Sequence, residues 1–381
     1  MVSIYVTPVG APVQAPPIVA ELEALFARLP DAPLLAALTG STRRGPKGHS
    51  VQALWHCVVV KYWLGLGSTD ALIRELRNNP YLAGACGVAG AIPHKATFSR
   101  FFAKLSELPF CGLVQEVSRE LVRQHHAALP GFGDRVAMDS TTIKAWSNGG
   151  QSPKADPDAG WAVKKNTHGK NEFTYGYKLH LLVDSEYELP IAATITPGNA
   201  NDAPQAKHLL ASAREHLPGF APRWLTADKG YDGAEMFRMV SEDYGAIPVI
   251  DVRQFKKQRE TRPCEAVPFS TPSGIRYRCH RQPYSPECPR FPKCPLLPIF
   301  ADGELNEVPP PEPRYNERYC RVPYGSPEWK AVFRTRGAVE RTFSRLKGQR
   351  ALNRVTVRRL PKLTVHCYLS LLAMQVGHLV A

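Results

Sequence analysis

The order of apolar segments between residues 134 and 251 is the feature that most constrains the fold of this chain. Three strand-like segments come first, followed by a helix, a strand, a second helix and a last strand. Short runs of β-branched and other apolar residues, bounded by turn residues, predict the strands, and longer amphipathic runs predict the helices. This order predicts an α/β fold with a mixed sheet flanked by helices. The predicted strands contain the segments RVAMD, YGYKLHLLVDS, LPIAATIT, RWLTAD and AIPVID.

Two regions of different character surround this pattern. Residues 1–130 read as helical, and the strongly apolar run at 51–66 predicts a buried helix within them. Residues 252–330 hold fifteen of the 35 prolines and five of the nine cysteines, and proline disfavours regular elements. We therefore expect an all-α N-terminal domain, a loop-rich Cys/Pro insertion, and an α/β domain in two parts, 131–251 and 331–381.

The charge of the chain indicates what it binds. The formal net charge is +14 and the sequence pI is about 9.4, which favours a polyanionic partner: nucleic acid first, an acidic membrane second. The N-terminal helices are candidates for DNA binding or dimer formation because they carry basic residues. A helical scaffold with solvated charges is the alternative, since no helix-turn-helix signature stands out. The basic residues concerned include Arg43, Arg44, Lys47, Arg74 and Arg100.

One segment has the length of a membrane span. Residues 363–381 contain no Asp, Glu, Lys or Arg, and that length is just enough to cross a bilayer. The polar residues His366, Ser370, Gln375 and His378 interrupt it, which favours a buried C-terminal helix instead. The N-terminal segment has no basic region followed by an apolar core, so we expect no secretory signal and a cytoplasmic location with no membrane partner.

Two aspartates end predicted strands. Asp139 ends RVAMD and Asp228 ends RWLTAD. Two carboxylates at the ends of neighbouring strands repel each other unless a cation lies between them. The ordinary alternative is a cap or turn role, which is common for aspartate at the end of a strand.

A glutamate in a basic segment is the third candidate. Residues 330–362 contain eleven Lys or Arg and one acid, Glu340, and so contribute ten of the net positive charges. At 100° per residue, Arg336, Glu340 and Lys347 form a line beside an apolar stripe. The stripe would pack on the sheet and the line would lie at its rim; the alternative is a solvated face with an Arg336–Glu340 pair. The stripe consists of Val339, Phe343 and Leu346.

These acids have the chemistry of a divalent-metal site. Two aspartates and a glutamate offer hard oxygen ligands, which suit Mg²⁺ or Mn²⁺ rather than zinc. Two such ions would activate an attacking oxygen and stabilise a leaving one in phosphodiester chemistry. Residue chemistry and spacing therefore indicate metal-dependent phosphodiester transfer on nucleic acid, held by a basic surface.

The same residues resemble a known family. MDSTTIKA around Asp139, TADKGYDG around Asp228 and the run TPGNANDA resemble bacterial insertion-sequence transposases that carry an Asp-Asp-Glu triad. The family signature of Tyr, two residues, Arg, three residues, Glu, six residues and Lys is met at Arg336, Glu340 and Lys347, with Phe333 in place of the tyrosine. The segments RELRNNPYLAGACGV and PHKATFSRF are similar to the helical domain that precedes the catalytic domain in one branch of this family.

The resemblance implies a fold, a site and an activity. The expected fold is a ribonuclease-H-like catalytic domain, with Asp139, Asp228 and Glu340 as catalytic metal ligands. The expected enzyme binds double-stranded DNA at the inverted repeats of a transposable element, cleaves the strand there, and joins the freed 3′-hydroxyl to target DNA. A homodimer or larger assembly on DNA is expected, because transposition joins two ends. The candidate DNA contacts are Arg336, Lys347, Phe333, Arg341 and Lys229.

Two rival functions share these features. A metal-dependent endonuclease that cuts without joining would have the same site, and a transposase-derived DNA-binding protein without activity would keep the same fold. The complete acid triad argues against the second.

The remaining polar candidates have weaker signals. A structural Zn²⁺ ion and several buried free thiols are both compatible with the insertion, because its cysteine spacing contains no Cys-x2-Cys pair. The cysteines concerned are Cys279, Cys288, Cys294 and Cys320. His180 and Asp184 are expected to be structural, and Asp202 and Asp232 are spare carboxylates to which we assign no role.

Overall fold

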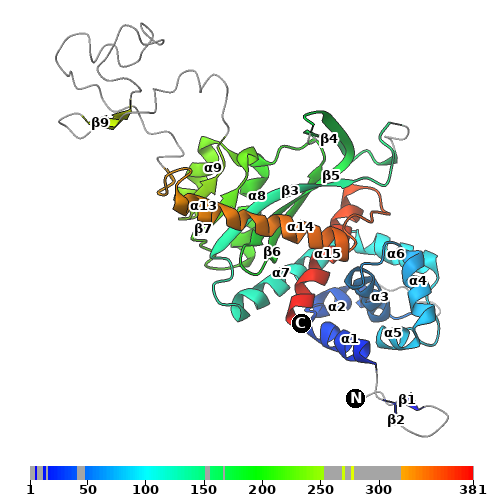
Figure 1. Cartoon of the computed structure of the whole chain (residues 1–381). Coiled ribbons are helices and arrows are strands. Elements are labelled where there is room, and N and C mark those ends of the chain that lie inside the picture. Colours follow the sequence, from blue (N-terminus) through cyan, green and yellow to red (C-terminus); the bar gives the residue numbers. More distant parts are fainter. Residues whose placement is uncertain are drawn as a thin grey trace, which may run out of the picture.

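A mixed sheet forms the centre of the α/β region (Figure 1). The computed structural model describes residues 5–6, 12–13, 16–40, 48–150, 155–165, 168–252, 268–270, 276–278 and 319–380. The sheet has the order β4-β5-β3-β7-β8, and β6 pairs with β5 on the same edge as β4. Its strands are β3 (Arg135–Lys144), β4 (Gly160–Lys165), β5 (Asn171–Asp184), β6 (Pro190–Pro197), β7 (Trp224–Ala227) and β8 (Ile247–Ile250).

The strand directions confirm the predicted mixed sheet. β3 is antiparallel to β5, and β5 is antiparallel to both β4 and β6. β7 is parallel to both β3 and β8. Parallel neighbours need a crossover connection, and the connection from β7 to β8 contains a helix. The five predicted strands are all present, and β4 is an addition that the sequence pattern did not suggest.

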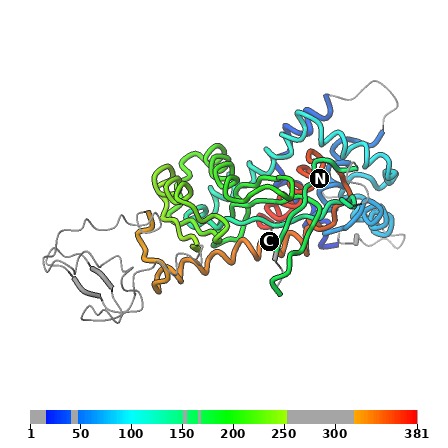
Figure 2. The backbone as a smooth tube through the Cα atoms, turned by 90° about the horizontal axis from the view of Figure 1, so that it is seen from above, coloured from blue at the N-terminus to red at the C-terminus, as the bar shows by residue number. Residues whose placement is uncertain are grey.

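Helices cover both faces of this sheet. One face packs on α8 (Ala203–His216), α9 (Ala234–Arg238) and the π-helical turn Met239–Asp243 that continues it. The other face packs on α14 (Gly337–Gln349) and α15 (Leu360–Val380). Figure 2 shows α14, in orange, along one side of the strands.

Alternation along β3 decides which face each side chain reaches. Ala137 and Ile143 belong to the core on the α14 side, whereas Val136 and Met138 belong to the core on the α8 side. Because successive strand residues point to opposite faces, Asp139 shares the face of Ala137 and points toward α14. The strand pattern therefore places the first candidate acid beneath the helix that carries Glu340.

The N-terminal residues are helical, as predicted, and gather at one end of the sheet (Figure 1). Their apolar core is continuous with the core on the α14 side of the sheet. The helices are α1 (Pro17–Arg28), α2 (Ala32–Gly40), α3 (Val51–Trp63), α4 (Thr69–Asn78), α5 (Pro80–Ala85), α6 (Lys95–Leu105) and α7 (Phe110–Ala128). The short elements elsewhere are β1 (Tyr5–Val6), β2 (Pro12–Val13), β9 (Pro268–Ser270), β10 (Arg276–Arg278) and α13 (Pro327–Phe333).

Helix α15 is the element that joins these helices to the sheet. It packs against α1, α3, α6 and α7 as well as β6. It is the one helix in the described part of the chain that is long and apolar enough to cross a membrane, but 78% of its apolar window is buried inside the protein. A helix that is apolar all round suits such a buried position, which agrees with the predicted buried C-terminal helix.

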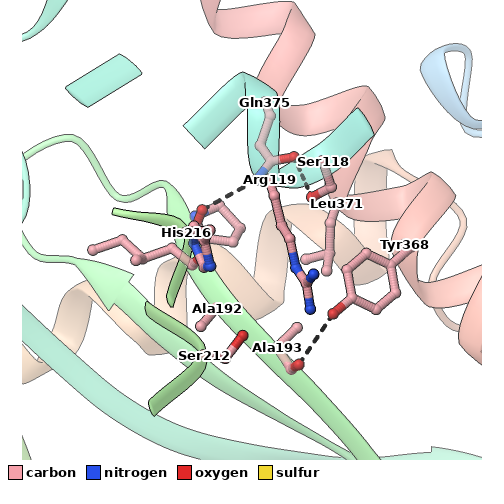
Figure 3. A pocket seen from close by; sticks show the side chains of 11 residues that line it. Ser118, Arg119, Ala192, Ala193, Ser212, His216, Tyr368, Leu371 and Gln375 are labelled. Atoms are coloured by element: carbon pink, nitrogen blue, oxygen red, sulfur yellow. Dashed lines mark hydrogen bonds between the residues drawn. The ribbon is translucent and has the colours of Figure 1, made fainter. Parts of the chain in front are cut away.

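The polar residues of α15 are satisfied by buried hydrogen bonds. The His366 ring lies between the Tyr62 hydroxyl, 2.8 Å from Nδ1, and the Leu352 carbonyl, 3.0 Å from Nε2. Gln375 accepts a hydrogen bond from Ser118 at 2.7 Å and donates one to the Pro190 carbonyl at 3.1 Å. Figure 3 shows Gln375 and Tyr368 of α15 reaching across to α7 and β6. These bonds explain how polar residues are tolerated in the core.

Gly176 marks the point where β5 changes partner. β4 pairs with β5 up to Gly176, and β6 pairs with β5 from Tyr177 onward. On its other edge Gly176 is paired with Lys144 of β3, and a Cβ on Gly176 would overlap the carbonyl oxygen of Ile143. Only glycine fits where backbones approach this closely.

We expect Gly176→Ala to destabilise the protein by about 3 kcal/mol, because overpacking against rigid backbone cannot be relieved by a rotamer change. Urea unfolding measures the free energy. Gly112→Ala is the matched control: Gly112 is exposed on α7 with nothing within 4 Å of the added Cβ, so it should gain roughly 0.5–1 kcal/mol. Equal stability of Gly176→Ala and wild type would contradict this packing.

Stability should fall as the pH drops from about 6.5 to about 4. Burial lowers the pKa of His366 from 6.5 to about 4, and that of His125 likewise. Above pH 6.5 both rings are neutral in the folded and unfolded chains; below it the unfolded chain binds protons that the folded chain does not. His366 alone should therefore cost about 3 kcal/mol by pH 4, at about 1.4 kcal/mol per pKa unit.

Urea unfolding between pH 7 and pH 4 measures this loss. His366→Gln keeps a polar side chain but cannot titrate, so its stability should depend less steeply on pH than that of wild type. Parallel pH curves for the two proteins would mean that His366 is not held neutral by burial.

Candidate active site

The register of two parallel strands brings Asp139 and Asp228 together. β3 and β7 pair up to Met138 and Ala227, so the next residue of each strand is one of the two aspartates. Asp139 lies within β3, where its side chain is 22% exposed, and its Oδ1 accepts a hydrogen bond from the Ser140 amide at 2.7 Å. Asp228 leaves the sheet directly after β7. Asp139 does not end its strand, as the sequence pattern suggested, because β3 continues to Lys144, but the two acids still lie side by side.

Asp228 is held by the turn that follows it. Its Oδ1 accepts a hydrogen bond from the Gly230 amide at 2.7 Å and caps the 3₁₀ turn Lys229–Tyr231. A Cβ on Gly230 would crowd this oxygen, so glycine allows the close approach. Capping of this kind fixes the carboxylate in position.

Negative charge accumulates around Asp139. The pKa of Asp139 is raised to about 6, chiefly by burial, and the nearby carboxylates of Asp228 and Asp202 contribute to this rise. The Ser140 amide and the Arg336 guanidinium oppose this shift in pKa by stabilising the charged form. A partly buried site that gathers carboxylates in this way favours a bound cation.

Arg336 connects Asp139 to Glu340. Its Nη2 lies 2.6 Å from Glu340 Oε1, and its Nη1 lies 3.4 Å from Asp139 Oδ2. Arg336 is mostly buried at 21% exposure, whereas Glu340 is 57% exposed. The Arg336–Glu340 pair that the sequence allowed is present, and it also reaches the first aspartate. The third acid thus approaches the other two through a shared arginine.

The segment carrying Glu340 differs in one respect from the predicted helix. The sequence analysis placed Arg336, Glu340 and Lys347 on one continuous helix, but the 3₁₀ turn Arg334–Arg336 separates α13 from α14. Gly337, a weak helix former, lies at the joint. The apolar stripe is as predicted: Val339, Phe343 and Leu346 are buried against the sheet.

Lys347 extends the basic edge of α14 along β3. Its ammonium donates a hydrogen bond to Thr141 Oγ1 at 2.5 Å. Burial lowers the pKa of Lys347, and the positive charge of Lys164 on β4 lowers it further. Arg336 and Lys347 therefore contact β3 on either side of Ser140, which places two cations along the strand that carries Asp139.

The other candidate DNA contacts have different surroundings. Phe333 stacks on Trp329 with ring centroids 4.6 Å apart, and Arg336 lies 5.7 Å from the Phe333 ring centroid. Arg341 forms an ion pair with Glu188, in the turn between β5 and β6, rather than reaching the acids. Lys229 is exposed beside Asp228. The contacts described above place Arg336 and Lys347 on β3.

A fourth carboxylate lies near these acids on the other face of the sheet. Asp202 precedes α8 and accepts a hydrogen bond from Lys178 Nζ at 2.9 Å. The buried His180 has Nδ1 3.6 Å from Asp202 Oδ1, and its Nε2 lies 2.9 Å from Thr196 Oγ1. The sequence reasoning assigned Asp202 no role; its place in TPGNANDA was the available signal. His180 is buried between Asp202 and Thr196, and its structural role stays a prediction.

Tyr231 was missed by the sequence reasoning. Its side chain is 1% exposed, and its hydroxyl has no hydrogen-bond partner among the described residues. Burial raises its pKa well above the ordinary value, and Asp139, Asp202 and Asp228 all add to that shift. A buried hydroxyl left without a partner beside three carboxylates indicates a space where a water molecule or a hydrated cation would be bound.

The residues fit a divalent cation in chemistry and charge. The donors are carboxylate oxygens, which hard cations prefer, and the orphan Tyr231 hydroxyl faces the same acids. As they stand, no three His, Cys, Asp or Glu residues in the described ranges are grouped closely enough to hold a metal ion. Glu340 is held by Arg336, so it would have to leave that pair to become a third ligand.

The zinc hypothesis concerns residues that mostly lie outside the described part of the chain. Cys279, Cys288 and Cys294 are among those residues. Cys320 is described: it is a buried free thiol that donates to the Val322 carbonyl at 3.1 Å, and burial raises its pKa.

Comparison with known proteins follows the same division of the chain. The model of the family described as "Transposase DDE domain" matches residues 130–376, and that of "Transposase domain (DUF772)" matches residues 17–104. No curated protein sequence matches. A cryo-EM structure of a piggyBac transposase synaptic complex with hairpin DNA is similar at 12% identity and a TM-score of 0.43, covering 97% of this chain and 76% of its own.

We expect Arg336→Met to lower stability in EDTA by about 2 kcal/mol, because it leaves Asp139 and Glu340 without their shared cation. The same variant should respond more strongly to divalent metal than wild type, since Glu340 becomes free to act as a ligand. Thermal unfolding in EDTA and in Mn²⁺ measures both effects. Arg334→Met, two residues earlier in the same 3₁₀ turn and with no carboxylate partner among the described residues, is the control; an equal Mn²⁺ response in all three proteins would contradict the expectation.

Proposed function

This chain belongs to the family of the transposase DDE domain, and we propose that it binds the terminal inverted repeats of an insertion sequence, cleaves the strand there and joins the 3′-hydroxyl to target DNA. The observation that carries this proposal is that Asp139 and Asp228 directly follow the last paired residues of β3 and β7, Met138 and Ala227, and that Arg336 links Glu340 to Asp139. The net charge of +14 supports a DNA substrate.

Asp139, Asp228 and Glu340 are the proposed ligands of two Mg²⁺ or Mn²⁺ ions. When bound, such ions supply activation of the attacking oxygen and stabilisation of the leaving oxygen in phosphodiester chemistry. The protein's own contribution is to fix the ligands. The Ser140 and Gly230 amides hold one oxygen of each aspartate, which orients the carboxylates before DNA binds.

Arg336 has two roles in this proposal. Without DNA it neutralises Asp139 and Glu340. When a phosphate of the DNA end arrives, the guanidinium would bind it in place of the Glu340 carboxylate. A guanidinium matches the geometry of phosphate as well as that of carboxylate. This exchange releases Glu340 toward the aspartates, so that the site becomes complete only when DNA is present.

Lys347 positions the DNA strand in the same proposal. Its ammonium lies on β3 at Thr141, where it would contact a phosphate next to the one at Arg336. Phe333, Arg341 and Lys229 are proposed as outer contacts, because they flank Arg336, Glu340 and Asp228 in the chain. Contacts of this kind orient the duplex without reading its sequence. A homodimer or larger assembly would bring two DNA ends together.

Glu340→Gln should lower metal-dependent cleavage by about a thousandfold or more, because loss of a metal ligand removes several kcal/mol of transition-state stabilisation. The assay uses purified protein, Mg²⁺ or Mn²⁺, and labelled DNA with the flanking inverted repeat, and it scores both nicking and joined product. Glu328→Gln, at an exposed glutamate on the neighbouring α13, is the matched control and should cleave like wild type.

The outcomes separate the rival functions. Nicking and joining by wild type, both lost in Glu340→Gln while DNA binding persists, support the proposal. Nicking without joined product would identify an endonuclease that does not join. DNA binding without cleavage in either protein would identify an inactive DNA-binding relative, and equal cleavage in both would remove Glu340 from the site.

A further inference from the structure

A second feature with the chemistry of a binding site lies in the N-terminal helices. A cavity of about 570 Å³ is lined by residues of α3, α4 and α6, by Trp146 after β3, by residues 356–358 between α14 and α15, and by Lys362 in the first turn of α15. This volume falls within the range of small-ligand and cofactor sites. Figure 1 shows α3, α4 and α6 together at the end of the sheet, so the cavity is separate from the acids.

A buried lysine without an acidic partner lies in the wall of this cavity. Lys61 of α3 is 7% exposed, and no carboxylate among the described residues forms an ion pair with it. Its ammonium lies 4.2 Å from the centroid of the Tyr62 ring, and burial lowers its pKa to about 8. Buried charges in proteins are nearly always paired. An aromatic ring compensates only part of the cost, which indicates that an anion completes the site.

The rest of the lining is also basic. Arg358 and Lys362 contribute two further cations, and neither has a carboxylate partner among the described residues. Asp70, the acid in the lining, is ion-paired with Lys95 at 2.6 Å. The cavity therefore carries a surplus of positive charge after its internal pair is counted, and a phosphate group is the anion that suits several converging cations.

Aromatic side chains lie beside these cations. Trp146 is 58% exposed, although large aromatic side chains are usually buried, and Phe98 and Phe102 of α6 form part of the same lining. Stacking on an exposed aromatic ring is how proteins bind unpaired bases. A phosphate site and a stacking surface within one cavity match the two parts of a nucleotide.

Strand β3 connects the cavity to the candidate active site. Trp146 follows the end of β3, and β3 also carries Asp139 and the Thr141–Lys347 contact. The five residue steps from Asp139 to Lys144 span about 17 Å of extended strand. A DNA strand that follows β3 and α14 away from the acids would arrive at the cavity within a few nucleotides.

We propose that this cavity binds an unpaired nucleotide of the DNA strand, with its phosphate at Lys61, Arg358 and Lys362 and its base against Trp146. This inference rests on the proposed function only in taking DNA as the substrate. It requires an unpaired nucleotide because a base stacked within a duplex offers no free face to the indole ring.

The test measures DNA binding without cleavage. Fluorescence anisotropy in EDTA compares a blunt labelled duplex with the same duplex carrying a short single-stranded 3′ overhang. Lys61→Met and Trp146→Ala should each weaken binding of the overhang DNA about tenfold, the scale of one stacked base or one phosphate contact. Binding of the blunt duplex should stay unchanged. Arg28→Met removes a charge from the exposed end of α1, outside the cavity, and should leave both affinities unchanged.

Thermal unfolding supplies a readout that a structural lysine would not give. Lys61→Met should raise the melting temperature, because it replaces a buried unpaired charge with an apolar side chain of similar length. If Lys61→Met instead unfolds, Trp146→Ala decides the test, because Trp146 is exposed and its truncation leaves the core intact.

Each outcome bears on one claim. Weaker overhang binding in the Lys61 and Trp146 variants, with Arg28→Met unaffected, supports the site. Equal overhang affinity in all proteins overturns it. Competition by a free deoxynucleoside monophosphate that depends on Lys61, without any effect on overhang DNA, would identify a small-nucleotide site and overturn the DNA assignment. Because the assay contains no metal, loss of cleavage in wild type would count against the proposed function alone.

Discussion

The burial of α15 is the constraint on which the rest of this structure depends. The helix is apolar on all sides, and it packs against α1, α3, α6 and α7 as well as β6. Its few polar side chains are satisfied by partners from different parts of the chain, such as Tyr62 for His366 and Ser118 for Gln375. The N-terminal helices and the sheet therefore share one core rather than meeting at a polar interface. That shared core fixes the position of the segment between α14 and α15, and with it both α14 above β3 and the basic wall of the cavity.

The chemistry depends on like charges held close together. Burial raises the pKa of Asp139, and Asp228 and Asp202 lie near enough to add to that rise. The fold offsets the repulsion with backbone amides and with Arg336. A protein with such a site is less stable without a bound cation than with one, as is common for preorganised active sites. Through these ion pairs Arg336 supplies positive charge to Asp139 and Glu340.

The cavity at Lys61 has a charge imbalance of the opposite sign. There the buried charge is positive and its partner would be an anion. In the two proposals a phosphodiester strand would serve both places at once, at the acids with the help of bound cations and at the cavity through its lysine and arginine side chains. β3 connects the two places, since Asp139 lies within it and Trp146 follows its end. One strand of the sheet therefore relates the proposed metal site to the proposed nucleotide site.

The sequence by itself determined the fold class, the helical N-terminal region and the buried C-terminal helix, because these follow from local patterns of apolar residues. It also pointed to Asp139, Asp228 and Glu340, since an acid at the end of an apolar strand or alone in a basic helix is conspicuous without any structure. Tertiary structure alone decided the rest. The link from Arg336 to Asp139 depends on a 3₁₀ turn that the helical pattern did not reveal. In the sequence Lys61 is one lysine in an apolar helix, with nothing to suggest a binding site. The proposed site became visible only because packing places Arg358 and Trp146 in the same cavity lining. Local pattern reports which face a residue occupies, whereas its electrostatic partners come from distant segments that only the folded core brings together.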